Sequence, residues 1–533
     1  MAGAYLESGD ARGTFLGHPK GLYVLFFAEM WERFSYYGMR ALLIFYLTKH
    51  WLFSDSESGI IYGAYTALVY ITPVVGGYLA DKYLGQRKAV LFGAVLLTLG
   101  HFFMAFEGDA GIGHVDNPII SIFWLALALI IVGSGFLKAN ISVIVGQLYP
   151  RTDVRRDGAY TIFYMGINLG AALGSLLCGY IGETYGWAYG FGLAGIGMLL
   201  GLIVFIWGKP LLLGRGEAKD PELLNKPVGG LKLEWWMYII GLVLVGICWL
   251  AIQFQDMVGY VLGVFGGALV LYVLFTAVTK LASDERDRIF AAMFLILTSI
   301  IFWALFEQAG SSLNLFTDRH VDRAGVPAST FQSINAIYII LLAPVFATLW
   351  TVMGRKGIEP SAPFKFGLGV VQVGLGFLVL VWGAQSVGLE NATPVIFIFL
   401  IYLLHTTGEL CLSPVGLSAM NRLAPAHMAS LIMGTWFFAS ATGNFAAGLI
   451  ASATGAEGVG EEAGKQVVLD VYTTVGWVAI AVGIGVLVVS PLIRNLMHLD
   501  TLKDDNVGDD LEGQREVGEP QAAGIHPTTK PQD

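Results

Sequence analysis

Long apolar runs recur along the whole chain, and each has the length that crosses a lipid bilayer. A run of about 18 residues or more is long enough to span the hydrocarbon layer as an α-helix. We expect fourteen such spans. Their approximate ranges are 22–48, 59–80, 88–106, 120–147, 160–182, 187–207, 234–253, 258–281, 289–311, 332–353, 365–387, 394–418, 429–452 and 471–494. This pattern predicts an all-α polytopic membrane protein.

The first expected span differs from the others because it carries four charged side chains. A charge at the centre of a bilayer costs at least ~2.5 kcal/mol, so four of them need a functional or a partnering reason. At about 100° per residue, these side chains and two tyrosines fall within an arc of roughly 140°. We expect the opposite face, which includes Phe26, Phe27 and Leu42, to face lipid, and the polar stripe to line a wet cavity or a buried charge network. The stripe consists of Glu29, Glu32, Arg33, Tyr36, Tyr37 and Arg40.

The composition agrees with a membrane protein. The 533 residues are 55% hydrophobic and only 13% charged, with a mean hydropathy of +0.66, whereas soluble domains contain about 25% charged residues. The net charge of −9 comes partly from acidic loops and from the C-terminal tail, and it gives no indication of nucleic-acid binding. Cys178, Cys248 and Cys411 lie in apolar spans without metal-ligand spacing, so we expect them to be packing residues.

The number of Lys and Arg residues alternates between successive loops. One set of loops contains eighteen of them, and the other set contains four, namely Lys49, Arg319, Arg323 and Lys465. Because loops rich in Lys and Arg stay in the cytoplasm, the richer set and both termini are predicted to be cytoplasmic. Residues 1–20 show no cleavable signal pattern, so the first span is expected to direct insertion into the plasma (inner) membrane.

The longest basic loop separates six spans from eight. The next two spans carry almost no charge within the membrane and are predicted to form an inserted hairpin; without them, six plus six spans remain, the layout of a two-lobed transporter with a site between its lobes. A fourteen-span protein without repeats would fit the same count. The expected parts are a cytoplasmic segment 1–20, an N-terminal six-helix lobe 21–207, a linker 208–233, the hairpin and its connection 234–288, a C-terminal six-helix lobe 289–494, and a disordered cytoplasmic tail 495–533.

Three further ionisable residues lie deep inside apolar runs. Lys138 belongs to the N-terminal lobe, whereas Glu307 and Glu409 belong to the C-terminal lobe. Bases on one lobe and acids on the other can form pairs that break as the lobes rock, and together they match the two charged ends of a zwitterion. Desolvated carboxylates at this depth are also candidate proton carriers. The alternative is that each charge belongs to a static pair that fixes helix packing.

Amide and aromatic side chains accompany these charges. Amides can hydrogen-bond to peptide-like groups, but they also join helices to one another at about 0.6 kcal/mol each. Trp303 precedes Glu307 by one turn, and Trp436 and Ser440 share a helix face. His405 is expected to be a hydrogen-bonded core group rather than the proton carrier. The accompanying residues are Tyr70, Asn168, Trp303, Asn335, Trp436 and Ser440.

Four segments resemble motifs of one transporter family. Residues 29–38 (EMWERFSYYG) resemble the ExxER signature of the proton-dependent oligopeptide transporter family, a branch of the major facilitator superfamily. Residues 76–85 (GGYLADKYLG), 163–170 (FYMGINLG) and 302–308 (FWALFEQ) are similar to its other motifs. The resemblance covers about residues 20–495, and the expected two-helix insertion is similar to that of bacterial members.

The resemblance implies proton-driven import of di- and tripeptides, with protons as the coupling ion and no cofactor. Matching positions assign the peptide carboxylate to Arg33 and Lys138, and the amino terminus to Glu409 with Asn168 and Asn335. The side-chain pockets would be shaped by Tyr37, Tyr70, Trp303, Trp436 and Ser440. Proton coupling would rest on Glu29, Glu32, Glu307 and Arg40, with Glu307 as the main protonation site. Asp81 and Arg87 would belong to a cytoplasmic gate. The alternative is that they serve only helix capping and the positive-inside membrane topology.

Other functions fit parts of this pattern. The charged cavity also suits amino acids, and relatives of this family move nitrate and other anions or small organic solutes. A channel or receptor is disfavoured because the charges are spread over both lobes. No HExxH motif, paired Asp motif or poised Ser nucleophile indicates an enzyme. The expected partners are the peptide, protons and the lipid bilayer, with no nucleic acid and no obligate protein partner.

Overall fold

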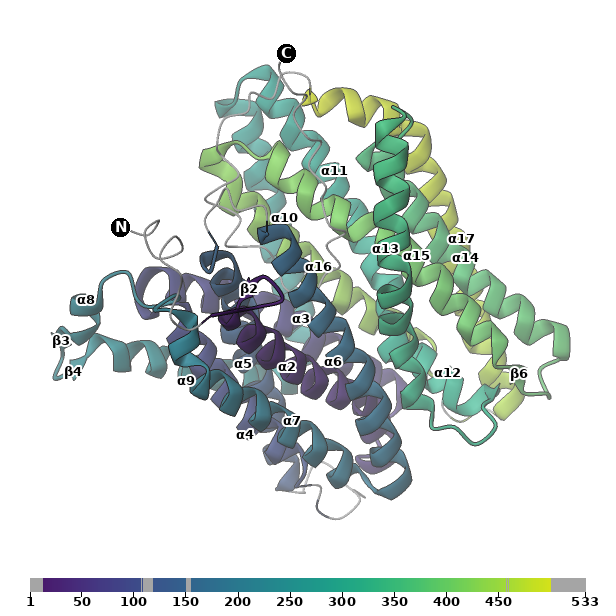
Figure 1. Ribbon diagram of the computed structural model, residues 1–533. Coiled ribbons are helices and arrows are strands. Elements are labelled where there is room, and N and C mark those ends of the chain that lie inside the picture. The colour runs from purple at the N-terminus through teal and green to yellow at the C-terminus, as the bar shows by residue number, and fades with distance from the viewer. Residues whose placement is uncertain are drawn as a thin grey trace.

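A bundle of long helices makes up almost the whole molecule (Figure 1). The computed structural model describes residues 13–106, 108, 118–149, 155–456, 458 and 460–499, so most of the expected tail and of the N-terminal segment lie outside the described residues. Within these ranges, fourteen helices have 19 or more residues. They are α2 (Lys20–Phe45), α3 (Asp55–Leu79), α4 (Gln86–Met104), α5 (Ile119–Gln147), α6 (Arg156–Tyr185), α7 (Trp187–Trp207), α9 (Leu233–Gln253), α10 (Gln255–Lys280), α11 (Ser283–Phe306), α13 (Ser333–Arg355), α14 (Ala362–Val387), α15 (Ile396–Leu423), α16 (Ala429–Ala453) and α17 (Glu461–Leu496).

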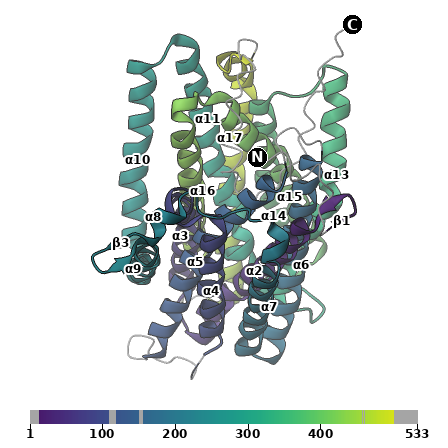
Figure 2. The same ribbon diagram turned by 60° about the vertical axis from the view of Figure 1, so that its left-hand side comes forward.

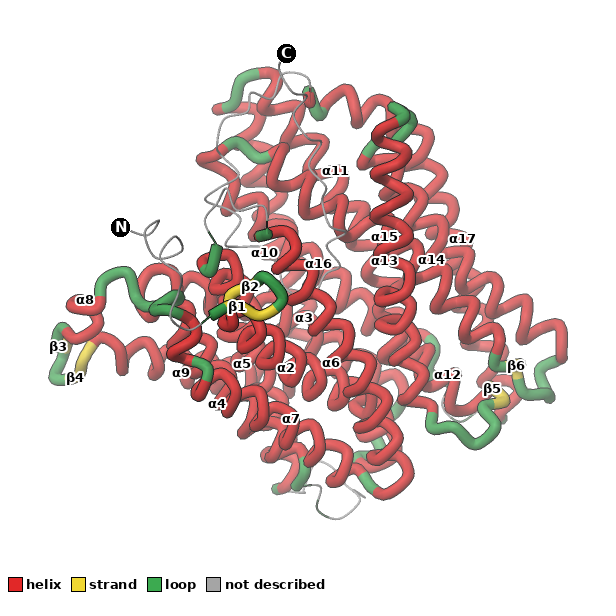
Figure 3. The backbone as a smooth tube through the Cα atoms, in the orientation of Figure 1, coloured by secondary structure: helices red, strands yellow, loops and turns green. Residues whose placement is uncertain are grey.

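Short elements join these helices. The linker contains α8 (Pro221–Asn225), and α12 (Ser312–His320) follows α11. Figure 3 shows how little of the chain is in strands. In the part of the chain that the structure describes, the three strand pairs are β1 (Thr14–Phe15) with β2 (His18–Pro19), β3 (Pro227–Val228) with β4 (Leu231–Lys232), and β5 (Val321–Asp322) with β6 (Thr393–Pro394).

The helices fall at the positions of the fourteen expected spans. Among the described residues, twelve helical segments are long and apolar enough to cross a membrane. The helices α2 and α16 are not among these twelve, and α2 carries the four charges of the polar stripe. The all-α polytopic membrane class is therefore confirmed, whereas the spanning character of α2 and α16 stays a prediction.

The buried apolar side chains form two main clusters. One cluster runs mainly from Leu22 to Leu262, and the other runs from Val273 to Met497. In Figure 1 the purple and blue helices of the first half lie below and to the left of the green and yellow helices of the second half. We call these two bodies the N-lobe and the C-lobe. The exact boundaries of the six-plus-six division stay a prediction.

The two inserted helices do not lie against each other along their length. Only Phe254 separates α9 from α10, and α9 packs mainly against α5 of the N-lobe. Instead, α10 packs against α3, α11 and α16, with Gly259 against Phe445 and Gly266 against Phe438. Figure 2 shows α10 standing at the left edge of the molecule beside α11 and α16. The expected pair of helices is present, but it spans from one lobe to the other.

The lobes meet at the end of the bundle where α12 lies (Figure 1, lower right). The Nζ atom of Lys49 lies 2.7 Å from Oδ2 of Asp318, and the guanidinium of Arg319 forms a bidentate ion pair with the carboxylate of Asp55. Ser56 and Ser452 are hydrogen-bonded at 2.5 Å. We call this the outer end, because the distribution of Lys and Arg predicts that it faces away from the cytoplasm. The lobes are in direct contact there.

Helices α3 and α16 approach each other closely near this outer end because glycines face each other. A Cβ atom added to Gly63 would lie 2.6 Å from the Cα atom of Gly448, and one added to Gly59 would lie 2.7 Å from the nitrogen of Ser452. Small residues allow such an approach between helices in lipid, where packing rather than apolar burial drives association. The two lobes therefore touch backbone to backbone.

One local expectation is wrong. Leu42 is expected to face lipid, but it is fully buried, because it packs into a space left by Gly182 and Gly190. The ninth expected span, 289–311, lies within the apolar helical segment Ser283–His320, in which α11 ends at Phe306 and gives way to the 3₁₀ turn η4 (Glu307–Gly310). This break separates α12 from α11 directly at the charged residue.

Candidate functional site

A cavity lies between the two lobes, and it gathers residues from distant parts of the chain. The N-lobe contributes to its wall from α2, α3 and α6; the C-lobe contributes from α11, η4, α13, α15 and the 3₁₀ turn η5 (Ala328–Gln332). Eight of the residues predicted from the sequence line it, namely Tyr37, Arg40, Tyr70, Asn168, Trp303, Glu307, Asn335 and Glu409.

Arg40 and Glu307 form a buried ion pair across the two lobes. The Nη2 group of Arg40 donates to Oε2 of Glu307, and the side chains are 9% and 5% exposed. The same guanidinium lies over the ring of Tyr37 at 5.7 Å from its centroid. Breaking a buried pair by removing one partner costs about 3–5 kcal/mol, because the other charge is left uncompensated. A proton on Glu307 would remove the opposing charge, so this contact is suited to couple protonation to lobe separation.

A second charge cluster lies on α2, about two to three helical turns before Arg40. The Nε group of Arg33 is 2.8 Å from Oε1 of Glu29 and 2.6 Å from Oε2 of Glu32. All three side chains are buried, and none of them lines the cavity. The helix places them on one side because Glu32 and Arg33 follow Glu29 by three and four residues. This cluster carries two acids and one base, and Lys138 lies within electrostatic range of both acids.

Glu409 faces the cavity from the C-lobe. Its Oε2 atom accepts a hydrogen bond of 3.0 Å from Nδ2 of Asn335, and Asn335 also donates to Thr406 at 3.0 Å. Asn335 lies on α13 and Glu409 on α15, so the bond joins two helices that both line the cavity. A carboxylate fixed by a neutral amide still offers acceptor atoms to a cationic group.

Lys138 lies against an aromatic ring of the cavity wall. Its Nζ atom lies 4.3 Å from the centroid of the Tyr70 ring, and Tyr70 lines the cavity whereas Lys138 does not. A cation over an aromatic face is attracted by the ring quadrupole. Lys138 therefore stands directly behind the cavity wall at Tyr70.

Comparison with known proteins identifies the family. The family model described as the POT family matches residues 87–463. The chain belongs to the POT family. A peptide transporter of Yersinia enterocolitica (YePEPT) is 38% identical over 466 residues, which cover 82% of this chain and 88% of the relative. Dipeptide and tripeptide permease B of Photorhabdus luminescens is 31% identical, covering 91% of this chain and 98% of that protein. An uncharacterized transporter of Bacillus subtilis (YclF) is 35% identical, covering 91% of this chain and 96% of that protein.

Solved structures show the same fold. The chain is similar to a crystal structure of a POT peptide transporter in complex with sulfate, with a TM-score of 0.79 and 34% identity, covering 93% of this chain and 99% of that one. It is also similar to a POT family transporter in complex with a thioalcohol-conjugated peptide, with a TM-score of 0.76 and 31% identity, covering 90% of this chain and 98% of that one. The resemblance found in the sequence motifs is confirmed, and the POT fold accounts for a bundle of two lobes around one cavity.

Two residues expected in the side-chain pockets of this POT-family chain lie elsewhere. Trp436 is fully buried in the C-lobe, where its ring packs against Phe366 and into the space left by Gly416. The hydroxyl of Ser440 donates to the carbonyl of Trp436 within α16 at 3.2 Å. Neither side chain is part of the cavity wall. In this conformation they support the C-lobe core, and their contact with substrate stays a prediction.

The two residues expected at a cytoplasmic gate have different partners. Asp81, in the π-helical turn after α3 (Ala80–Leu84), accepts a hydrogen bond of 2.7 Å from Gln86, the first residue of α4. Arg87 donates from Nε and Nη2 to Glu217 of the linker, at 2.5 and 3.2 Å. Both contacts lie within the N-lobe and its linker, so a gating role for Asp81 and Arg87 stays a prediction.

The structure adds cavity residues that the sequence had not indicated. Gln332, Tyr402 and His405 line the cavity from the C-lobe. His405 lies close to the carbonyl of Val373 at 3.2 Å and is buried, in agreement with its expected role as a hydrogen-bonded core group. Tyr62 on α3 contacts Arg40 directly. Its position eight residues before Tyr70, which places it about two turns away on the same helix face, was the available signal.

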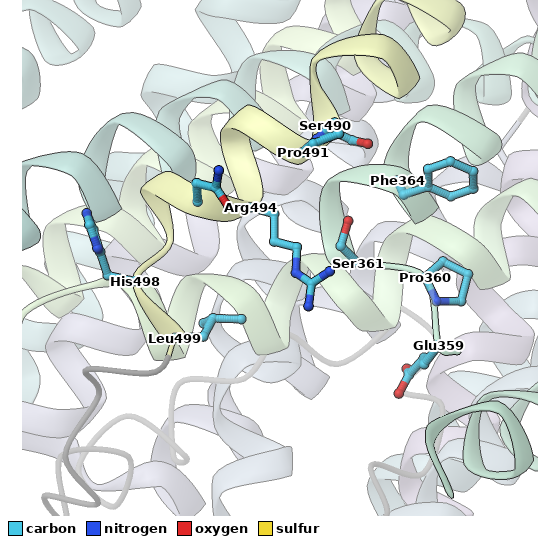
Figure 4. A pocket seen from close by; sticks show the side chains of 10 residues that line it. Glu359, Pro360, Ser361, Phe364, Ser490, Pro491, Arg494, His498 and Leu499 are labelled. Carbon is cyan, nitrogen blue, oxygen red and sulfur yellow. The ribbon is translucent and has the colours of Figure 1, made fainter. Parts of the chain in front are cut away.

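A second pocket lies on the C-lobe, away from these residues. It is bounded by the loop before α14 and by the end of α17, and Figure 4 shows the side chain of Arg494 extending toward Ser361 there. None of the residues predicted to bind substrate or protons lines it. The chemistry of the site therefore belongs to the cavity between the lobes.

The role of Lys138 can be tested with a blocked peptide. We expect Lys138→Ala to lower the affinity for dialanine roughly 10-fold or more, the size of one lost charge-assisted contact, and to leave the affinity for dialanine methyl ester unchanged. The measurement is competition for peptide uptake by both compounds. Lys82→Ala is the matched control, since Lys82 also lies over tyrosine rings but outside the cavity. If Lys138→Ala changed the affinities for dialanine and for its methyl ester by the same factor, or changed neither, Lys138 would not bind the carboxylate.

Proposed function

We propose that this protein is a proton-coupled symporter that imports di- and tripeptides by alternating access. The relatives named as peptide transporters and permeases support the substrate class. The observation that carries the coupling is the buried pair between Arg40 and Glu307, because it joins the two lobes inside the cavity and is broken by a single proton. The location that fits is the plasma (inner) membrane, with both termini in the cytoplasm.

The peptide would be held between the two lobes. Its ammonium group would be bound by Glu409, with Asn335 fixing that carboxylate, and Asn168 would contribute from α6. Its carboxylate would be bound by Arg33 and Lys138. Arg33 is paired with Glu29 and Glu32 in this structure, and Lys138 stands behind Tyr70. Tyr37 and Trp303 would contact the peptide side chains. The zwitterion thereby links one lobe to the other, which favours closure around it.

The proton would act on the contact between the lobes. With Glu307 ionised, its pair with Arg40 adds to the contacts of the outer end and favours the conformation described here. With Glu307 protonated, that attraction is lost, and opening at the outer end costs less. A proton gradient thus biases which end of the cavity opens, and this bias drives the peptide inward. Glu29 and Glu32 would support coupling through their effect on Arg33.

Uptake into liposomes tests this proposal. With an acid exterior, we expect the purified protein to accumulate labelled dialanine above the external concentration, and a protonophore to abolish the accumulation. The control is the same measurement at equal pH on both sides, where dialanine should only equilibrate. Absence of dialanine uptake by a folded preparation, with uptake of amino acids, nitrate or another small solute instead, would reject the peptide assignment.

A further inference from the structure

Tyr62 bonds directly to the ion pair that joins the two lobes. It lies on α3, is 2% exposed, and accepts a hydrogen bond of 2.6 Å from Nε of Arg40. Arg40 reaches Glu307 through its other end, Nη2. The guanidinium thus has partners in both lobes: Nε donates to Tyr62 of the N-lobe, and Nη2 donates to Glu307 of the C-lobe.

The same hydroxyl also touches the turn that carries Glu307. A Cβ atom added to Gly310, the last residue of that turn, would lie 1.8 Å from Oη of Tyr62 and 3.3 Å from Nε of Arg40. No side chain fits at this place while the hydroxyl occupies it. Tyr62 therefore lies between Arg40 and the break after α11, and glycine at position 310 leaves the room that it needs.

We propose that Tyr62 is a positioning residue for proton coupling. It keeps Nε of Arg40 away from Glu307, so that Arg40 bonds to this carboxylate through Nη2 alone. An Arg–carboxylate pair is strongest when two parallel hydrogen bonds form. Without the Tyr62 hydroxyl, Nε and Nη2 would both be available to the same carboxylate. The hydroxyl thus keeps the pair weak enough to be broken by one proton, and it holds Arg40 in the N-lobe once the pair has opened. This inference rests on the proposed function.

Other titratable groups surround the pair and must be distinguished from Tyr62. They are Tyr36 and Tyr37 on α2, Tyr65 on α3, and Tyr402, His405 and Glu409 on α15. Among the described residues, the buried hydroxyl of Tyr65 has no hydrogen-bond partner. Tyr65→Phe is therefore the matched control, because it removes the same atom from the same helix without touching Arg40.

The test is the pH dependence of proton-driven dialanine uptake by Tyr62→Phe in liposomes. We expect its half-maximal uptake to require an exterior roughly one pH unit more acid, the shift expected when the pair gains one charge-assisted hydrogen bond. The maximal rate should fall and the KM for dialanine should stay within about twofold, as expected when no direct contact with the substrate is lost. Tyr65→Phe should behave like the parent.

An unchanged pH dependence in Tyr62→Phe, or a shift to less acid pH, would overturn the inference. In the second case the hydroxyl would strengthen the ion pair instead of limiting it. Failure of the parent protein to take up dialanine would reject the proposed function, which is a separate result.

A second variant gives the answer if Tyr62→Phe does not fold, with dialanine exchange at equal pH as the check on folding. Gly310→Ala leaves the tyrosine in place but forces its hydroxyl away from Arg40. We expect it to shift the pH dependence in the same direction, and adding Tyr62→Phe to it should give no further shift. A normal pH dependence of Gly310→Ala would contradict the inference.

Discussion

Replacing Glu307 with glutamine is expected to abolish proton-driven uptake of dialanine while leaving exchange of dialanine partly intact. Glutamine keeps the shape of the side chain and an acceptor for Nη2 of Arg40, but it cannot take up and release a proton. A gradient of two pH units supports about 100-fold accumulation when one proton is coupled. The Glu307→Gln variant should show none of this accumulation.

Two measurements on the same liposomes separate coupling from binding. Exchange at equal pH requires the cavity and the rocking motion but no net proton movement, so Glu307→Gln should retain it in part. The control is Glu359→Gln, which removes a carboxylate paired with Lys365 at the surface of the C-lobe. If uptake and exchange are lost to the same extent, Glu307 is not the dedicated proton carrier.

The sequence predicted the polar residues of the site better than it predicted which surfaces face lipid. The stripe on α2 followed from helical periodicity, which fixes the side chains that share a face. Leu42 on the other face was assigned to lipid, although it packs against Gly182 and Gly190. Lipid tails and neighbouring helices are equally apolar, so a hydrophobic residue gives no indication of which of them it contacts.

The same limit applies around the cavity. Trp436 and Ser440 share a face of α16, but the sequence does not fix how that helix is rotated, and in this structure the face is directed into the C-lobe core. The turn that follows α11 at Glu307 lies against Tyr62 of the other lobe. Such a contact between residues far apart in the chain has no local pattern from which it could be predicted.

Gly448→Val is expected to abolish both uptake and exchange of dialanine, in contrast to Glu307→Gln. A Cβ atom at Gly448 would lie 2.7 Å from the carbonyl oxygen of Gly59 and from the Cα atom of Gly63. Both neighbours are backbone atoms of α3, so neither can turn aside as a flexible side chain would. Valine adds two methyl groups at this contact, and inserting such groups into a packed interface costs about 1–3 kcal/mol or more.

The outer end of the cavity would therefore stay open in Gly448→Val, although Arg40, Glu307 and Glu409 are unchanged. Direct binding of dialanine to the purified protein should remain, which separates a block of closure from a failure to fold. Gly434→Val on the same helix is the matched control, because a Cβ atom there meets no heavy atom within 4 Å. Normal exchange by Gly448→Val would mean that the close approach of α3 and α16 is not needed in the cycle. Loss of exchange with binding retained would instead make this contact a steric requirement for alternating access, independent of the proton that Glu307 takes up.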